Sequence, residues 1–404
     1  MKIALVTFGC RLNRAEALDL EASLAAAGHK IIPLPQGSDP TTPDLIIVRG
    51  CSVTAKAQRD CEKAIVRLRQ RFPNSQVSIT GCLPDAIPFT PPRDQTPVPT
   101  STSRAYLKIQ DGCNGKCSFC IVPHFRGPSV SIPSADLMAR ARAFIAAGYQ
   151  EIVVTGCNLS LYSSNGIGLV ELIYSLANLS PPGSDPTLKC DPTLKCRVRL
   201  GSLEPGMFGS KILDVFETHP NICRFLHLSI QSGSDRILSA MNRPYRISAV
   251  SEFVQAARRR LGQRIMLGAD IITGFPGETE DDFLSTRRFL SDGEFTNVHV
   301  FPFSERPGTP AATMAGSVPT EDRRERAKII AEDAAIRRRR FAESFIGKNV
   351  EVCVERGGDH GWTDEYLQVK LDSPHPRRSL VCATVTAAED DVLIASSPPA
   401  AKKP

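Results

Sequence analysis

The chain has 404 residues, 42% hydrophobic and 23% charged, which is the composition of a folded protein of two or three domains and excludes a disordered chain. It contains no uncharged apolar run of about 18 residues and its apolar start is too short for an export signal, so we expect a cytoplasmic protein with no membrane partner. The net charge of +6 permits a nucleic-acid partner, and 13 cysteines in a reducing compartment indicate metal or redox chemistry rather than disulfides.

The first predicted domain covers residues 1–82 and alternates short apolar strands with helices, a pattern typical of a parallel α/β sheet. The strands are expected at 3–8, 31–34, 45–48 and 77–80, and the helices at 15–27 and 54–71. Cys10, Cys51 and Cys82 each follow a glycine at or just beyond a strand end. Ligands gather at this edge of open α/β sheets, so the three cysteines are candidate ligands, the alternative being ordinary buried residues.

A linker rich in proline, threonine and serine is predicted at 83–103, and a second domain at 104–319. Its strands are expected at 106–109, 152–155, 198–201, 225–230, 265–272 and 298–303. Helical stretches between them, such as 134–147, 211–219 and 249–261, favour a partial TIM-type (β/α)6 barrel. The active site of such a barrel lies at the carboxyl ends of its strands.

A hexapeptide is duplicated within this region, at 185–190 and 191–196. Two copies are too few for a repeat architecture, so we interpret them as an insertion in a surface loop. Cys190 and Cys196, which end the two copies, are expected to have no function.

The remaining chain is predicted to form a connecting helix, 320–345, and a small β domain, 346–398. Short strands at 349–355, 365–371, 379–387 and 391–395 indicate a small five-stranded barrel, a shape often used to bind nucleic acid. The connecting helix holds four consecutive arginines, 337–340, which point in different directions around a helix. They form either a solvated face or a phosphate-binding strip.

The most informative segment runs from Asp111 to Cys120. Cys113, Cys117 and Cys120 are spaced so that their thiolates can hold one face of an iron–sulfur cubane. No fourth cysteine stands nearby, so one iron stays open for another ligand. The alternative is a structural zinc site, but zinc favours paired cysteines or closely spaced histidines, and His124 fits no such pattern. We therefore expect a cluster after the first strand of the barrel.

Further along the chain, ordered motifs complete a pattern that resembles the radical S-adenosylmethionine methylthiotransferases, most closely the branch that acts on threonylcarbamoyladenosine in tRNA. The motifs that carry the resemblance are Thr7–Asn13, Cys51–Thr54, Gly81-Cys82, Ile109–Cys113, Ile121–Pro123, Arg126–Ser129, Ser202–Pro205, His227–Ser234, Met241–Tyr245, Asp270–Thr279, Arg306–Thr309 and, in the C-terminal barrel, Glu355 with Gly361–Tyr366. The last of these resembles the TRAM module.

The resemblance implies two 4Fe–4S clusters and S-adenosylmethionine as cofactors. Cys113, Cys117 and Cys120 would hold the cluster that cleaves S-adenosylmethionine, and Cys10, Cys51 and Cys82 an auxiliary cluster that presents sulfur. Gly156, Glu204 and Gln231 are candidate contacts of S-adenosylmethionine. The implied reaction adds a methylthio group to C2 of N6-threonylcarbamoyladenosine, at position 37 of tRNA, using two S-adenosylmethionine molecules. The implied partners are the anticodon stem-loop and an electron donor such as flavodoxin or ferredoxin.

Two departures from the family pattern qualify this hypothesis. Arg49-Gly50 replaces the usual Asn-Thr before Cys51, and the stretch 83–103 stands where a longer segment is expected, so the N-terminal domain is expected to be shortened. Two alternative functions stay open: the same reaction on N6-isopentenyladenosine, and a degenerate tRNA-binding protein that keeps one cluster.

Overall fold

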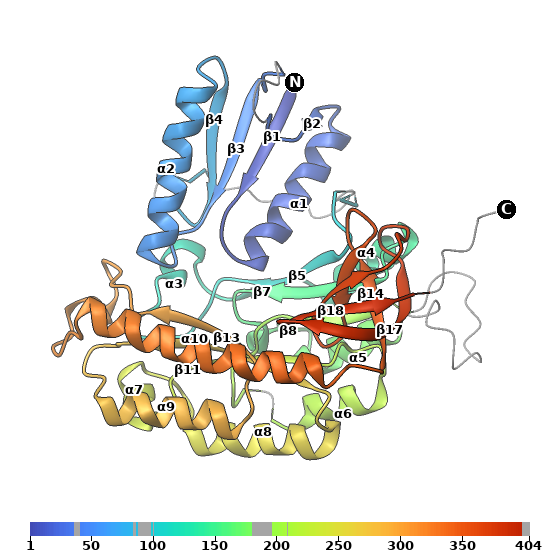
Figure 1. Ribbon diagram of the computed structural model, residues 1–404. Helices are drawn as coiled ribbons and strands as arrows, with labels where there is room; N and C mark the ends of the chain where they lie inside the picture. Colours follow the sequence, from blue (N-terminus) through green and yellow to red (C-terminus); the bar gives the residue numbers. More distant parts are fainter. Residues whose placement is uncertain are drawn as a thin grey trace.

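The computed structural model describes residues 1–35, 41–83, 86–87, 98–99, 101–179, 196–207 and 209–397. Its architecture agrees with the predicted class: a parallel α/β sheet, a partial barrel and a closed β-barrel follow one another along the chain (Figure 1). No helix in the described part of the chain is long and apolar enough to cross a membrane.

The N-terminal sheet has the strand order β2-β1-β3-β4, and every pair of neighbours is parallel. Its elements are β1 (Lys2–Thr7), α1 (Arg11–Ala26), β2 (Lys30–Ile32), β3 (Leu45–Gly50), α2 (Ala55–Arg71) and β4 (Gln76–Gly81). Helix α1 begins four residues earlier than predicted, directly after Cys10. The carboxyl ends of β1, β3 and β4 therefore lie side by side, each followed by a cysteine.

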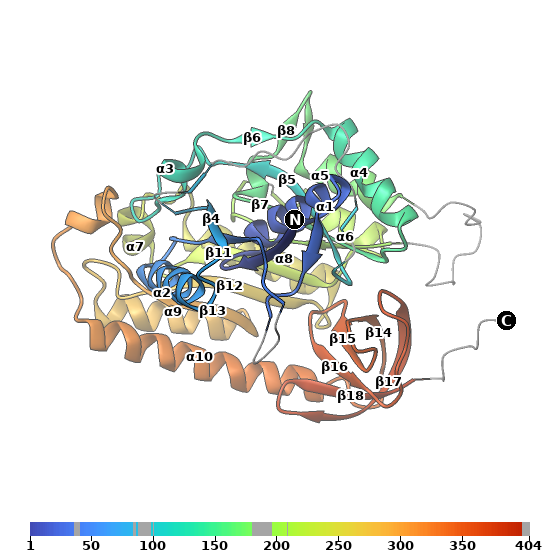
Figure 2. The same ribbon diagram turned by 90° about the horizontal axis from the view of Figure 1, so that it is seen from above.

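Six parallel strands form the central half-barrel, with the helices on its outer side (Figure 2). The strands are β5 (Ala105–Asp111), β7 (Glu151–Gly156), β10 (Arg197–Leu200), β11 (Phe225–Gln231), β12 (Met266–Thr273) and β13 (Asn297–Pro302). Single bridges, Val198 to Ile222 and Leu203 to Leu228, continue the sheet from β10 to β11. A short strand, β6 (Val130–Ser131), pairs antiparallel with the last residues of β5.

The helices of this region are α3 (Val122–Arg126), α4 (Ser134–Ala146), α5 (Leu169–Ala177), α6 (Lys211–Thr218), α7 (Asp235–Ala240), α8 (Ile247–Leu261) and α9 (Glu280–Asp292). Within the described part of this region, a two-strand ribbon, β8 (Ser163–Ser164) with β9 (Ile167–Gly168), and two 3-10 turns, Leu159–Leu161 and Pro310–Thr313, complete the set.

Residues alternate between the two faces of the half-barrel, as strand geometry requires. On β11, Leu226, Leu228 and Ile230 join the core under the helices. The intervening positions therefore face the interior of the half-barrel, which we call the lumen. Lumen-facing positions include Lys108, Glu151, Arg199, His227, Ser229, Asp270 and His299. This face is strongly polar, as expected for a surface that receives a polar ligand.

The C-terminal domain is a closed barrel with the strand order β14-β15-β16-β18-β17. Its strands are β14 (Asn349–Val354), β15 (His360–Thr363), β16 (Gln368–Leu371), β17 (Leu380–Glu389) and β18 (Val392–Ser396). The predicted strand 365–371 is wrong in its first half, because Tyr366 has a φ of 71° and the chain turns there. The fifth strand, β15, was not predicted.

Helix α10 (Thr320–Glu343) packs along β13 and leads to this barrel (Figure 1). Its arginines do point in different directions. Arg337 donates to the carbonyl of Phe295, whereas Arg338 and Arg339 pair with Asp391 and Asp390 of the barrel. Two members of the run therefore fasten the barrel to the helix, which favours a structural role over a phosphate-binding strip.

The small barrel closes the lumen at the amino ends of the half-barrel strands, which we call its lower end, through a buried ionic cluster. Arg197 and Arg199 both pair with the fully buried Glu151 and donate to backbone carbonyls of Trp362, Thr363 and Asp364. Burial would raise the pKa of Glu151, but the two guanidinium groups hold it far below its usual range. The two domains consequently share one electrostatic core.

Two predictions fall mainly outside the described residues. Most of the linker 83–103 and the duplicated hexapeptide up to residue 195 belong there, including Cys190. Cys196 is described and is buried in the core next to β10, so its placement in a surface loop was wrong. The domain boundaries stay predictions.

Candidate functional site

The loop that holds Cys113, Cys117 and Cys120 leaves the carboxyl end of β5 and is anchored on both sides. Gly112 has a φ of 67°, and a Cβ there would lie 1.9 Å from the carbonyl oxygen of Pro128, so only glycine fits this turn. Ser118 donates its backbone N–H to Met241 and its hydroxyl to Ala240, both at the end of α7. These anchors fix the loop over the carboxyl ends of the half-barrel strands, which we call the upper end of the lumen.

The surroundings of these three cysteines suit an iron–sulfur cluster. The N–H of Gly115 donates to Sγ of Cys113 at 3.3 Å, and the Arg243 guanidinium donates to Sγ of Cys117 at 3.0 Å. Hydrogen bonds to sulfur are a usual means of stabilising and tuning such clusters. Burial raises the pKa of Cys120 to about 11, so metal binding must displace a proton from it. Three thiols with cationic and N–H donors therefore fit the group, and we call these cysteines the first trio.

Glu204 lies beside the first trio. It pairs with Arg243 at 3.2 Å and accepts a hydrogen bond from Asn158. Because Arg243 also donates to Cys117, one arginine links the carboxylate to a candidate cluster ligand. This position suits contact with the amino acid part of S-adenosylmethionine, as the sequence predicts, although that role stays a prediction.

Gly156 and Gln231 stand at the ends of β7 and β11. A Cβ at Gly156 would lie 3.0 Å from the carbonyl oxygen of Gln110 and 3.2 Å from Leu159, so its immediate neighbours are other parts of the chain. Gln231 has a φ of 74°, which is uncommon for this residue and turns the chain sharply after β11. Both residues lie at the carboxyl ends of the half-barrel strands, at the rim of the lumen.

The loop 274–279 forms a tight turn between β12 and α9. Gly274 has a φ of 68° and its α-carbon faces Arg323, while Thr279 and Asp282 form a capping box that begins α9. These contacts explain the local structure of this motif.

Cys10, Cys51 and Cys82 converge at the carboxyl edge of the N-terminal sheet, and we call them the second trio. Cys10 and Cys82 both act electrostatically on Cys51, whose pKa burial raises to about 11. A Cβ on Gly9, which has a φ of 94°, would lie 2.5 Å from Cβ of Cys51. Glycine is thus required before Cys10 so that these two cysteines can approach. Cys61 lies next to the second trio, its thiol donating to the carbonyl of Cys51 at 3.7 Å.

Arg126 links the second trio to the half-barrel. It ends α3, six residues after Cys120, and its Nε donates to Sγ of Cys82 at 3.0 Å. The same guanidinium binds Asn13, Glu16 and Asp111 at 2.9 to 3.0 Å. Lys108 bridges Glu16 and Asp111, and Arg49 pairs with Glu16. Burial alone would raise the pKa of Glu16, but these cations lower it to about 2. A charged, buried network therefore spans the interface between the N-terminal sheet and the half-barrel.

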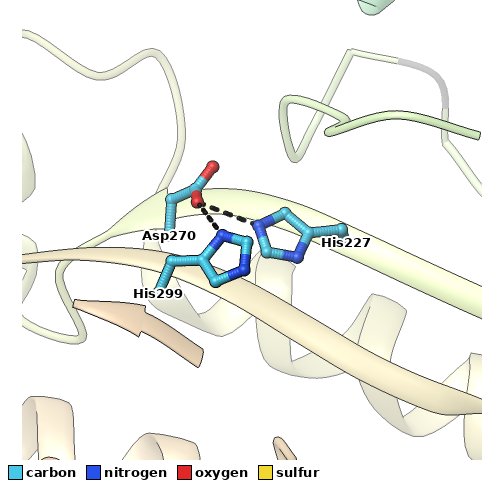
Figure 3. Close-up of side chains that lie close together, drawn as sticks. All are labelled: His227, Asp270 and His299. Carbon is cyan, nitrogen blue, oxygen red and sulfur yellow. Dashed lines mark hydrogen bonds and ion pairs between the residues drawn. The ribbon is translucent and has the colours of Figure 1, made fainter. Parts of the chain in front are cut away.

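His227, Asp270 and His299 form a further cluster on the lumen side of β11, β12 and β13 (Figure 3). Asp270 accepts from Nε2 of His227 at 2.9 Å, Nδ1 of His299 at 3.2 Å and the hydroxyl of Ser229 at 3.1 Å. Burial would raise the pKa of Asp270, but the two imidazoles lower it, so it is a carboxylate. Burial lowers the pKa of His227, so that imidazole is neutral at pH 7.

Although the three ligand atoms lie within 4.8 Å of one another, a metal site is disfavoured. A metal on Nε2 of His227 would move its proton to Nδ1, and Nδ1 is buried with no hydrogen-bond partner among the described residues. Metal-binding histidines almost always donate that second proton. The cluster is therefore a hydrogen-bonded group in which Asp270 orients both rings.

Sequence reasoning assigned no role to Arg126, Arg243, Asp270 or His299. The first three fall within motifs that were recognised, yet only the folded chain shows which sulfur or ring each one meets. His299 lies on a predicted strand. Because side chains alternate between the two faces of a strand, its position in that strand could have indicated that it faces the lumen. Cys157 donates to Asp111 and belongs to neither trio.

Comparison with known proteins agrees with this architecture. Residues 107–290 match the Radical SAM superfamily, and residues 2–90 match the Uncharacterized protein family UPF0004. The threonylcarbamoyladenosine tRNA methylthiotransferase MtaB of Rickettsia prowazekii is 31% identical, with 91% of each chain covered. The tRNA-2-methylthio-N(6)-dimethylallyladenosine synthase of Thermobifida fusca is 30% identical over 87% of this chain and 77% of the relative.

Among solved structures, the radical S-adenosylmethionine methyltransferase TsrM of Kitasatospora setae superposes with a TM-score of 0.53. It is 14% identical and 77% of each chain is covered, so this likeness concerns the fold alone. The sequence relatives, by their identity and coverage, show the family as well as the fold. The chain belongs to the radical S-adenosylmethionine tRNA methylthiotransferases and is an enzyme of that class.

Proposed function

We propose that this enzyme adds a methylthio group to C2 of N6-threonylcarbamoyladenosine, at position 37 of tRNA, using two molecules of S-adenosylmethionine. Relatives named for this substrate, from Rickettsia prowazekii and Thermotoga maritima, are 31% and 30% identical over 91% of the chain. Their names support the substrate; the site supports the chemistry.

The observation that carries the proposal is the pairing of two cysteine trios across one interface. Arg126 donates to Cys82 of the second trio and follows Cys120 of the first trio on the same short loop and helix. Sulfur insertion into an unreactive aromatic C–H needs a radical source and a sulfur source at one substrate atom. Two thiol sites that share one interface meet that requirement.

When bound, a 4Fe–4S cluster in the first trio supplies the electron that cleaves S-adenosylmethionine, and one in the second trio supplies the sulfur. The chain itself binds and positions. Glu204, Gly156 and Gln231 would hold S-adenosylmethionine at the carboxyl ends of the half-barrel strands. Arg243 would fix the position of Glu204 relative to Cys117. The N-terminal sheet would cover this site and exclude water from it.

The macromolecular partners follow from the same proposal. The C-terminal barrel would grip the anticodon stem-loop, because phosphate contacts hold register while the splayed base is read elsewhere. A reduced flavodoxin or ferredoxin would deliver the electron. The proposed domains are those predicted above: 1–82, 104–319 and 346–398, with the linker and helix between them.

The decisive experiment is nucleoside mass analysis of tRNA from a strain with and without this gene. We expect the methylthio form of threonylcarbamoyladenosine to disappear and to return with the wild-type gene, but not with Cys117→Ala. Persistence of that nucleoside in the deletion strain would disprove the substrate assignment.

A second candidate is the same reaction on N6-isopentenyladenosine, favoured by the 30% identity to the Thermobifida fusca enzyme. Loss of the methylthio form of that nucleoside in the same analysis would select it. The degenerate binder is separated by iron content, since two intact clusters require about eight irons per chain and one cluster about four.

A further inference from the structure

The Arg126 guanidinium has an acceptor for each of its five N–H groups. Its Nε donates to Sγ of Cys82 at 3.0 Å. The other four N–H groups donate to Asn13, to Asp111 and to both carboxylate oxygens of Glu16, at 2.9 to 3.0 Å. The Arg126 side chain is 9% exposed and Cys82 is 7% exposed, so the bond to sulfur is shielded from water. A planar guanidinium held at five points has one position, and the sulfur that it binds is fixed with it.

Asn13 extends this contact to the rest of the second trio. Its side chain is buried, and its Oδ1 accepts from Arg126. Its Nδ2 donates to the carbonyls of Phe8 at 3.0 Å and Gly50 at 2.7 Å. Phe8 lies two residues before one of the other cysteines, and Gly50 lies directly before the other. Arg126 therefore reaches one cysteine directly and the strand ends of the other two through a single buried amide.

The network around Arg126 carries one more positive charge than negative charge. Three cations face two carboxylates in it: Arg49, Lys108 and Arg126 against Glu16 and Asp111. Asp19, one turn further along α1, pairs with Arg140 and leaves the balance unchanged. The excess charge lies against Sγ of Cys82, where a thiolate ligand would balance it.

The first trio has a related contact with a different charge balance. Arg243 donates to Sγ of Cys117, also at 3.0 Å. There the cation has its own carboxylate, because Glu204 pairs with Arg243 at 3.2 Å. The excess of positive charge is therefore a feature of the network beside the second trio.

Reduction adds one negative charge to an iron–sulfur cluster, so a nearby cation and an N–H donor at sulfur both stabilise the reduced form. We propose that Arg126 is a positioning residue that holds Cys82 in place and raises the reduction potential of the cluster in the second trio. This inference rests on the proposed function, which assigns a cluster to that trio. Arg126 acts through the sulfur of Cys82, so its effect is measured as the potential of one cluster.

The test measures a potential rather than turnover. The full-length chain with Cys113→Ala, Cys117→Ala and Cys120→Ala, called the parent chain, is reconstituted anaerobically and should hold about four irons in the second trio. It is titrated with reductant while electron paramagnetic resonance follows the reduced cluster. In this background Arg126→Met should move the midpoint potential to a more negative value. Arg126→Lys keeps the charge but cannot form five hydrogen bonds, so it should move the potential by less.

Two controls separate this effect from a general loosening of the interface. Arg140→Gln removes the pair with Asp19, which also joins the half-barrel to α1, and should leave the potential unchanged. Lys108→Gln removes a cation that pairs with Glu16 and Asp111, and it should shift the potential by less than Arg126→Met.

A second measurement decides the case in which Arg126→Met loses its iron. The parent chain is prepared with ¹⁵N-labelled arginine, and its reduced cluster is examined by pulsed electron paramagnetic resonance. We expect a coupling to the label, because a hydrogen bond to a ligand sulfur carries unpaired spin density to the donor nitrogen. Absence of this coupling would overturn the inference.

Two results of the potential measurement would also overturn it: an unchanged potential in Arg126→Met, and an equal shift in Arg140→Gln. Failure of the proposed function is a separate result. A parent chain that binds no iron, while the wild type does, would show that the second trio holds no cluster and would overturn both. A parent chain with its full iron content, and with a potential that Arg126→Met leaves unchanged, would overturn this inference alone.

Discussion

At the scale of single residues, each cysteine of the second trio depends on the glycine before it. Gly9 and Gly81 have φ values of 94° and 96°, and a Cβ on Gly50 would lie 2.0 Å from Leu83. Strand ends that bring three sulfurs together leave little room for side chains beside them. The glycines are therefore part of the site although they carry no ligand atom.

Gly9→Ala should prevent the second trio from holding its proposed cluster while leaving the first trio intact. The added Cβ would meet Cys51 at 2.5 Å in a backbone conformation that alanine avoids. Iron after anaerobic reconstitution should fall from about eight to about four per chain. Gly28→Ala is the control, since Gly28 has a φ of 85° but nothing lies within 4 Å of its added Cβ. Full iron content in Gly9→Ala would contradict this account.

Glu16 predicts how stability depends on pH. Its pKa is about 2 in the folded chain against 4.5 when unpaired, so its stabilising effect is fully present above about 4.5 and is lost as the pH falls toward 2. A shift of this size corresponds to about 3 kcal/mol. Denaturant unfolding between about pH 6 and pH 3 should show a smaller decline in Glu16→Gln than in the wild type. Glu62→Gln, on the exposed side of α2, should keep the wild-type decline.

At the scale of elements, helix α9 begins with a capping box that also holds α7. Thr279 accepts from the N–H of Asp282, whose carboxylate accepts from Thr279, Ser234 and Arg236. Thr279→Ala should lower the free energy of unfolding by about 1 kcal/mol. The control Ser285→Ala lies on the exposed side of the same helix and should change it much less. Equal effects would show that the box contributes nothing.

Element prediction succeeded in the half-barrel and failed at one segment of the small barrel. The strands of the half-barrel are short runs that are buried along most of their length, and such runs can be recognised in a sequence. The segment 365–371 has the composition of one strand, but Tyr366 adopts a left-handed φ of 71° and stacks on Trp362 at 4.7 Å. This turn exists because Arg199 and Phe225 of the half-barrel pack against it, which no local pattern reveals.

At the scale of the whole molecule, the buried cluster around Glu151 couples the small barrel to the half-barrel. Glu151→Gln would leave Arg197 and Arg199 buried without their shared carboxylate, at a cost of roughly 3–5 kcal/mol. Hydrogen exchange should then accelerate in β14 and β15, which these arginines contact through backbone carbonyls. Glu217→Gln removes an exposed pair with Arg260 and should leave exchange there unchanged. Unaltered protection in Glu151→Gln would refute the coupling.

The fold class and the candidate cluster ligands can be inferred from the amino-acid sequence alone. Apolar periodicity indicates strands and helices locally, and the spacing of Cys113, Cys117 and Cys120 places three thiols within one short loop. The contacts between residues that are distant in the sequence became known only from the folded chain. Arg126 meets Cys82 from a distance of 44 residues, and Asp270 meets His227 and His299 from neighbouring strands. Such contacts depend on how sheets face one another, and that arrangement is the sum of the whole chain's packing rather than a property of any segment.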